Sequence, residues 1–497
     1  MICAFMPALT HQHGGLTISR LQLQRRLPLA ALPAALNHGK GRRPPSHGCR
    51  PKHRTYQLHP RALIAAQAAA AEVDVAVIGG GIIGLCVALE LLSHASHLSV
   101  ALIERQVPCS GATGAGQGYI WLAHRQPDSP GWAIAQRSKQ LWESMIDAAE
   151  TSSKNGHCSK KLGRKADIEW QENGSMLLAL TAQEGQDLQD RAAMLQQNGI
   201  SAAYHGRAAV TELEPALQLP HSGGALLVES DAQLSGRRAA EVLLARCHEA
   251  AGPSGRFQAY MNEPVQSVQL SPQTGAVNAV STASRLLVTR KGVVLAAGAW
   301  SGHLLSTATG DDRWREVFKP RRGHLLELQL PAGMPPLRHG LMEMGYTQHL
   351  HKSGPLEDTG ADIAFTATPS ASGTCLVGSA REFSGWDVNP SHSIQEGIMQ
   401  RAAHFLPGLS NYGSASEGVR VGLRPYALGG LPFIGPVAEV PQLFLAAGHE
   451  GAGLTMAPGT AELVVQHLMQ ENTTLEQQHV DAFSPAQRMH AALAGVT

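Results

Sequence analysis

The first 71 residues contain no Asp or Glu, although the chain of 497 residues has 39 acidic residues in all. The same stretch holds ten of the 40 Lys and Arg residues, so residues 72–497 carry 30 basic (40 − 10) and 39 acidic residues, a formal net charge of −9. A body with this charge lacks the basic surface that nucleic-acid binding needs. We therefore expect no nucleic-acid partner.

An acid-free, Arg-rich leader directly before a domain is typical of an organelle transit peptide. We predict a disordered transit peptide over residues 1–71, which directs the protein to the chloroplast in preference to the mitochondrion. The alternative is a disordered basic arm with no targeting role.

Cysteine is sparse, with seven residues and no C-x-x-C pair, and the 24 His residues form neither an H-x-x-x-H nor an H-E-x-x-H pattern. Reduced, structural thiols and an intracellular site agree with this usage, and we predict no metal site. No run of 18 apolar residues occurs, so we expect no transmembrane segment.

A strand–glycine–helix–strand pattern begins immediately after the leader. The apolar run 73–78 is followed by Gly79, Gly81 and Gly84 in G-x-G-x-x-G spacing, by an amphipathic helix, and by a second apolar run that ends at Glu104. The glycines allow a tight turn, close approach of a pyrophosphate and close helix–strand packing, while the acid at this distance binds a ribose hydroxyl. This register predicts a dinucleotide site at the helix N-terminus.

A second glycine-rich turn follows another apolar strand near the end of the chain, in LFLAAGHEGAGLTMAPG (443–459), where we expect a helix over 454–469. Its helix N-terminus offers N–H groups and a partial positive charge to a ligand. NAD would not need a second such turn so far along the chain. A flavin dinucleotide would, because its ring lies far from its pyrophosphate.

Seven motifs then resemble, in order, the D-amino acid oxidase superfamily of FAD enzymes, the group that holds glycine oxidase, sarcosine oxidase and hydroxyproline dehydrogenase subunits. They are VAVIGGGIIG, SGATG (110–114), LAAGAWS, PRRGHLL, VGSAREFSGWD (377–387), GLRP and AGHEGAGLTMAPG. The resemblance covers about residues 72–470.

The resemblance, together with the alternation of strand-rich and α/β stretches, predicts an α/β plus α+β fold, in which a Rossmann-type FAD-binding domain is interleaved with a strand-rich substrate domain. The expected boundaries are 72–165, 231–317 and 396–475 for the FAD-binding domain, 166–230 and 318–395 for the substrate domain, and 476–497 for a C-terminal tail.

The resemblance also implies cofactor-binding residues along the whole chain. They are Gly79, Gly81, Ile82, Ile83, Gly84, Glu104 and Arg105 for the ADP half, Val265 near the adenine, Ala112, Thr113, Gly116, Gln117 and Gly118 beside the flavin ring, and Ala297, Gly298, Trp300, Arg424, Gly448, Gly451, Ala452, Gly453, Leu454 and Thr455 elsewhere along the cofactor. The loop 111–118 lacks the histidine that tethers flavin in one branch of the family, and no Cys stands in the attachment context of another. We therefore expect non-covalent FAD.

Arg424, in GLRP, matches the arginine that holds the substrate carboxylate in glycine and D-amino acid oxidases. Tyr346, His449 and Arg322 are further candidates for the substrate pocket. The resemblance implies oxidation of the C–N bond of a small amino acid or secondary amine by hydride transfer to flavin N5. The resulting imine hydrolyses, and O2 or another acceptor reoxidises the flavin.

Two other functions remain open at this point. A 2-hydroxyacid dehydrogenase of the same superfamily would use the same arginine but needs a base for the hydroxyl proton, for which His449 is the candidate. A non-enzymatic assembly factor that keeps FAD for stability is the other, and the intact GLRP motif argues against it.

Overall fold

The computed structural model describes residues 71–154, 163–348, 360–410 and 418–494. Apart from Ala71, the predicted transit peptide lies outside these residues, so the targeting assignment stays a prediction. Most of the described chain is built on two eight-stranded sheets, with a short two-stranded sheet between β3 (Tyr119–Ile120) and β7 (Ala232–Gln233).

The first sheet has a parallel centre, in the order β17-β18-β11-β1-β2-β8, with β10 and β9 added beside β11. β1 pairs in parallel with both β2 and β11, and β11 in parallel with β18, which is the arrangement of a doubly wound nucleotide-binding sheet. The strands are β1 (Ala71–Ile78), β2 (Val100–Ile103), β8 (Phe257–Tyr260), β9 (Ser267–Leu270), β10 (Val277–Ser281), β11 (Leu286–Leu295), β17 (Phe433–Pro436) and β18 (Leu443–Ala447).

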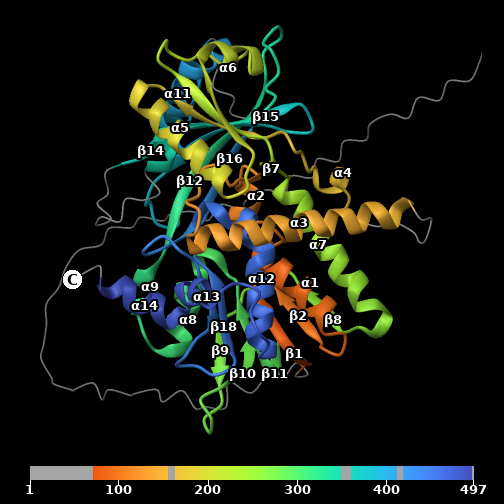
Figure 1. The fold of residues 1–497 in the computed structure, drawn as a ribbon. Helices are drawn as coiled ribbons and strands as arrows, with labels where there is room; N and C mark the ends of the chain where they lie inside the picture. Colours follow the sequence, from red (N-terminus) through yellow and green to blue (C-terminus); the bar gives the residue numbers. More distant parts are fainter. Residues whose placement is uncertain (1–70, 155–162, 349–359, 411–417, 495–497) are drawn as a thin grey trace, which may run out of the picture. The chain divides into compact units, whose positions relative to one another are not determined.

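Both faces of the first sheet are covered, as a parallel sheet requires. Side chains alternate along β1, so Val75 and Val77 join the helix core on one face while Ala76 and Ile78 join the core on the other. Figure 1 shows α1 beside α12 on the first of these faces, with α3 and α7 packed against them. These helices are α1 (Ile82–His94), α3 (Pro130–Lys154), α7 (Gly236–Ala251) and α12 (Gly453–Met469).

The opposite face of the first sheet is covered by α8 (Ser301–Thr309), α9 (Arg313–Val317) and α14 (Pro485–Ala494). The C-terminal stretch predicted as a tail therefore forms helices. Phe483, in α13 (Gln477–Phe483), is fully buried, and a buried Phe side chain contributes about 1.5–3 kcal/mol to stability.

The second sheet is mostly antiparallel, in the order β16-β12-β15-β14-β13-β4-β6-β5. Its strands are β4 (Ser175–Ala179), β5 (Ala202–Gly206), β6 (Gly224–Val228), β12 (Phe318–Gln329), β13 (Gly340–Glu343), β14 (Asp362–Pro369), β15 (Thr374–Arg381) and β16 (Val419–Ala427). The two sheets thus take their strands from alternating parts of the chain.

One predicted boundary is wrong, because residues 396–475 do not all belong with the first sheet. β16 pairs with β12 along nine residues of antiparallel register, from Phe318–Ala427 to Leu326–Val419. Helix α11 (His392–Phe405) packs on β14 and β15, with Ile398 and Phe405 in their core. The second sheet therefore reaches to Ala427, and the chain returns to the first sheet at β17.

The remaining helices are short connections or cover the second sheet. They are α2 (Ala112–Ala115), α4 (Lys165–Ile168), α5 (Ala182–Gln197), α6 (Arg207–Leu213), α10 (Met344–Gln348) and the 3-10 turns η2 (Gly252–Ser254), η3 (Gly298–Trp300), η4 (Pro407–Leu409) and η5 (Glu450–Ala452). Across the described ranges, every helix is too short or too polar to cross a membrane.

Candidate active site

A cavity of about 340 Å³ is lined by both glycine-rich turns, by the loop around α2 and by β12 and β16. Of the predicted residues, those that line it are Gly79, Gly81, Ile82, Ile83, Glu104, Arg105, Ala112, Thr113, Gly116, Gln117, Gly118, Val265, Ala297, Gly298, Trp300, Tyr346, Arg424, His449, Gly451, Gly453 and Leu454. Residues separated by more than 300 positions in the sequence thus share one site.

The first glycine turn fits a phosphate ligand. A Cβ on Gly79, whose φ is +114°, would lie 2.3 Å from the Ala296 carbonyl oxygen, and one on Gly84 would lie 2.0 Å from the Gly79 oxygen. These two glycines serve packing. A Cβ on Gly81 would instead meet only the Thr113 hydroxyl within the described residues, at 3.4 Å. Gly81 therefore leaves open space in front of the N-terminus of α1, where an anion is stabilised.

Glu104 stands at the end of β2, as predicted, and is 8% exposed. Its Oε2 accepts the Gly80 N–H at 2.7 Å and its Oε1 accepts the Gln106 N–H at 2.9 Å. Since each carboxylate oxygen has a second lone pair, Glu104 can still accept ribose hydroxyls from the cavity. Next to it, the Arg105 guanidinium carbon lies 3.7 Å from the centroid of the Trp300 ring.

Four predicted cofactor residues do not line the cavity, because they pack against or form hydrogen bonds with neighbouring residues of the protein. Gly84 packs against Gly79, and Gly448, with φ +89°, lets the turn pass under Ala427. The Thr455 hydroxyl donates to the Tyr119 carbonyl oxygen at 3.1 Å. Ala452 donates its N–H to the His449 carbonyl oxygen at 2.8 Å.

The second glycine turn presents fewer free N–H groups than predicted. Gly451 donates its N–H to the Glu450 side chain, and Ala452 donates within the turn. The N–H groups left for a ligand are those of the first turn of α12, from Gly453 onward, which also carries the positive end of the helix dipole.

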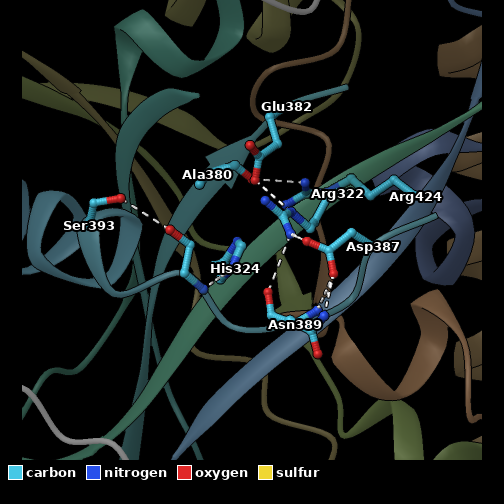
Figure 2. Close-up of polar contacts among 9 residues, drawn as sticks. Arg322, His324, Ala380, Glu382, Asp387, Asn389, Ser393 and Arg424 are labelled. Atoms are coloured by element: carbon cyan, nitrogen blue, oxygen red, sulfur yellow. Dashed lines mark hydrogen bonds and ion pairs between the residues drawn. The ribbon is translucent and has the colours of Figure 1, made fainter. Parts of the chain in front are cut away.

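The substrate end of the cavity is built on the β12–β16 pair. Arg321 and Arg424 are directly opposite in the ladder and so lie on the same face of the sheet. Gly323 makes room for Arg424, because a Cβ there would lie 2.0 Å from Arg424 Nη1. Arg424 Nη1 donates to the Ala380 carbonyl oxygen at 3.0 Å (Figure 2). Within the described part of the chain, Arg424 forms no ion pair with a carboxylate.

Arg322 was predicted for the substrate pocket, and this is wrong. Strand side chains alternate, so Arg322 points to the opposite face from Arg321 and Arg424. Figure 2 shows it surrounded by the loop after β15: its Nε donates to Glu382 at 2.7 Å, and its Nη1 donates to Asp387 and to the Asn389 carbonyl oxygen. Arg322 therefore fixes that loop.

The same loop carries Trp386 back to the first sheet. The ring centroids of Trp386 and Trp300 lie 5.2 Å apart, so Trp300 contacts both Trp386 and the Arg105 guanidinium. Because Trp300 lines the cavity, the Arg322 contacts support the cofactor end of the site without touching it.

His449 lines the cavity but is poorly suited to act as a base. It is 4% exposed, and its Nε2 lies 3.0 Å from the Thr460 hydroxyl oxygen. Burial lowers the pKa of His449 to about 3, so the imidazole is neutral at physiological pH and accepts a proton only weakly.

Tyr346 belongs to a buried wall at the substrate end. Its ring centroid lies 4.2 Å from the Arg381 guanidinium carbon, and Arg381 also pairs with Asp362 at 2.8 Å. Tyr119, which the sequence did not single out, lies beside Tyr346 and lines the same cavity. Burial raises the pKa of the Tyr119 phenol well above its usual value, so this phenol stays protonated and can donate a hydrogen bond.

Glu450 is a second residue that the sequence did not single out, and Arg321 is its partner. Glu450 lines the cavity, and its Oε1 lies 3.4 Å from Arg321 Nη1. Arg321 could have been found from the alternation of side chains along β12, once its pairing with Arg424 was known. No local pattern marked Glu450.

Groups of three or more possible metal-ligating side chains are absent from the described residues.

Comparisons with known proteins identify the family and the fold of the chain. A model of the FAD dependent oxidoreductase family matches residues 74–467. The chain is 25% identical to a glycine oxidase of Geobacillus kaustophilus over 410 residues, which is 81% of this chain and 94% of the relative.

Solved structures show the same fold. The crystal structure of glycine oxidase from Geobacillus kaustophilus has a TM-score of 0.67 at 22% identity, covering 83% of this chain and 98% of that one. L-proline dehydrogenase from P. horikoshii has a TM-score of 0.68 at 17% identity, covering 85% and 99%. The predicted fold class, with its Rossmann-type and strand-rich parts, is confirmed.

Proposed function

Given that the chain belongs to the FAD dependent oxidoreductase family, we propose that this FAD enzyme oxidises the C–N bond of a small amino acid or secondary amine that bears a carboxylate. The observation that carries the proposal is Arg424. It lines the cavity, and among the described residues it is held by a backbone carbonyl and not by a carboxylate. A guanidinium in this state matches a substrate carboxylate through two parallel hydrogen bonds.

When bound, FAD accepts the two electrons that the oxidation releases. The protein's own groups orient the substrate and shape the field around it. Arg424 fixes the carboxylate, the half-buried Tyr119 and the buried Tyr346 close the wall against water, and the N–H groups from Gly453 onward stabilise negative charge at the helix N-terminus. No protein base is needed once the nitrogen is neutral, so a substrate that binds in the ammonium form loses one proton before the oxidation.

The lowered pKa of His449 disfavours the 2-hydroxyacid alternative. That reaction needs a base for the hydroxyl proton, and His449, with a pKa of about 3 and its Nε2 beside Thr460, is a weak one. A non-enzymatic protein that keeps FAD for stability is disfavoured by Arg424, which has no carboxylate partner among the described residues. An unpaired ion in a partly buried site costs stability, and a protein that binds no substrate gains nothing from it.

Non-covalent attachment is also part of the proposal. Cys109 is the cysteine that lines the cavity, and burial raises the pKa of its thiol to about 11. The thiol is therefore protonated near neutral pH and is a poor nucleophile. Flavin that is released on acid precipitation supports this, and flavin that stays with the precipitated protein contradicts it.

The test of function is anaerobic bleaching of the flavin absorbance by a panel of small amino acids, N-methyl amino acids and 2-hydroxyacids. Bleaching by amines that carry a carboxylate supports the proposal. Bleaching by 2-hydroxyacids alone, or by no compound, contradicts it. Repeating the reaction in air or with a dye acceptor then separates an oxidase from a dehydrogenase.

A further inference from the structure

Two arginines lie on one face of the β12–β16 ladder at the substrate end of the cavity, and among the described residues only one of them has a carboxylate partner. Arg321 and Arg424 are directly opposite in the β12–β16 ladder, a position in which like charges repel. Glu450 forms an ion pair with Arg321 at 3.4 Å, and both of these side chains are 13% exposed. The wall of the cavity therefore presents the Glu450 carboxylate, with Arg321 as its counter-ion, and Arg424, which has no carboxylate partner among the described residues.

Glu450 is held in an unfavourable conformation. It lies in η5 with φ +46°, in the left-handed region that residues other than glycine rarely adopt. Its other contact is the N–H of Gly451. Such strain persists where the surrounding structure imposes it, and it gathers at functional sites. Here it holds a carboxylate at the wall of the cavity.

Glu450 and Arg424 are close enough to contact one small molecule. They flank Gly451, where a Cβ would lie 3.9 Å from Arg424 Nε and 3.4 Å from the Tyr119 hydroxyl. A carboxylate has about four lone-pair positions for hydrogen bonds, and the Arg321 and Gly451 contacts occupy two of them. Glu450 therefore retains the capacity to accept a hydrogen bond from a ligand.

We propose that Glu450 accepts an N–H from the substrate's amino group while Arg424 binds its carboxylate, which makes Glu450 the residue that selects α-amino acids over 2-hydroxyacids. This rests on the proposed function, because it uses the same pocket and the same carboxylate anchor. The two groups of an α-amino acid are attached to one carbon, so neighbouring positive and negative side chains match them. A 2-hydroxyacid offers the same carboxylate but a neutral hydroxyl in place of the ammonium group, so its contact with Glu450 lacks the attraction between opposite charges.

The competing account makes Glu450 only the counter-ion of Arg321. Glu382 provides the matched control, because it forms the corresponding ion pair with Arg322 at 2.7 Å on the opposite face of β12. If Glu450 acts only through Arg321, then Glu450→Gln should change the binding of glycine and glycolate by the same factor, and Glu382→Gln should change the binding of neither.

The test uses FAD-loaded protein and two small probes that differ in one group, glycine and glycolate. The apparent Kd of glycine is taken from the rate of anaerobic flavin reduction, and the Kd of glycolate from perturbation of the flavin absorbance. Hydrogen bonds to charged groups set the expected size, so Glu450→Gln should weaken glycine by roughly 10- to 150-fold. Glycolate should bind unchanged or more tightly, because the substitution removes a negative charge that repels the carboxylate of glycolate.

Each outcome decides something. A parent protein that binds neither probe contradicts the proposed function. A parent that binds glycolate but not glycine overturns the role of Glu450 and leaves Arg424 in place. An equal loss of both probes in Glu450→Gln, or a loss of glycine selectivity in Glu382→Gln as well, also overturns it. Glu450→Asp keeps the negative charge but holds it farther from the ligand, because the Asp side chain is shorter. It should recover part of the glycine binding, and it shows whether the loss in Glu450→Gln comes from misfolding.

Discussion

The two ends of the cavity are made from different material. At the cofactor end the wall is largely backbone, namely the turn at Gly79–Gly81, the N-terminus of α1 and the small residues around α2. At the substrate end it is made of side chains from Arg424, Tyr346, Tyr119 and Glu450. A backbone wall binds a phosphate through its geometry and is indifferent to the substrate, whereas specificity must come from the side-chain end.

Breaking the backbone end should have the largest effect, since the cofactor is lost. Gly81→Leu places a side chain where the present structure leaves open space before α1, and a pyrophosphate cannot occupy the same volume. We expect colourless purified protein, measured by the flavin absorbance. Gly206→Leu is the matched control, because Gly206 lies outside the cavity, has an ordinary φ of −70° and would have no heavy atom of the described residues within 4 Å of an added Cβ. A yellow Gly81→Leu protein with normal flavin content would overturn the cofactor placement.

Breaking the side-chain end should leave the flavin bound and remove turnover. Truncating one partner of a buried charge pair costs about 2–5 kcal/mol, so Arg424→Ala should lose roughly 30- to 5,000-fold in kcat/KM on a carboxylate substrate. Arg424→Lys should recover part of this, because a point charge cannot reproduce the planar fork. An unchanged kcat/KM in Arg424→Ala would show that the carboxylate binds elsewhere.

Arg322 lies one residue from Arg321 and should behave in the opposite way. Its loss leaves Glu382 and Asp387 without their cation, and we expect Arg322→Ala to lower the free energy of unfolding by about 2–3 kcal/mol, below the range for fully buried pairs because Asp387 is partly exposed. The preference for glycine over glycolate should not change. Thermal unfolding and the two ligand titrations measure this. A change in ligand selectivity would place Arg322 in the pocket after all.

Acid tests the burial of His449 separately from ligand binding. His449 has its pKa lowered to about 3 by burial, against about 6.5 in the unfolded chain. The unfolded state therefore binds the proton first, and stability falls as the pH drops from 6.5 towards 3, by up to about 1.4 kcal/mol per pH unit. In His449→Gln this part of the pH dependence should disappear, as measured by Tm between pH 4 and 7. Equal slopes for the two proteins would contradict the burial argument.

The sequence predicted the backbone end better than the side-chain end, and the reason is physical. A glycine turn is local, so the spacing of Gly79, Gly81 and Gly84 and the distance to Glu104 are enough to locate it. A side-chain wall depends on which strands pair and in which register. Arg322 was chosen and Arg321 missed because only the pairing of Arg321 with Arg424 shows which face points to the cavity.

The same distinction between local patterns and strand pairing explains which part of the fold was predicted. The alternation of two kinds of segment was visible in the sequence, but β16 was assigned to the wrong sheet, because its membership is set by pairing with β12, about a hundred residues earlier. Glu450 was not predicted from the sequence, for a related reason. Its role depends on a left-handed turn and on Arg321, and neither leaves a pattern in the residues around it.

The most direct measurement of the central claim needs no mutation. Anaerobic flavin reduction by glycine and by N-methylglycine is compared with reduction by glycinamide and methylamine, which keep the nitrogen and lack the carboxylate. The account predicts that the carboxylate-bearing compounds reduce the flavin with a kcat/KM-type constant at least about 30-fold higher, the lower bound for losing the Arg424 pair. Equal or faster reduction by glycinamide or methylamine would contradict it.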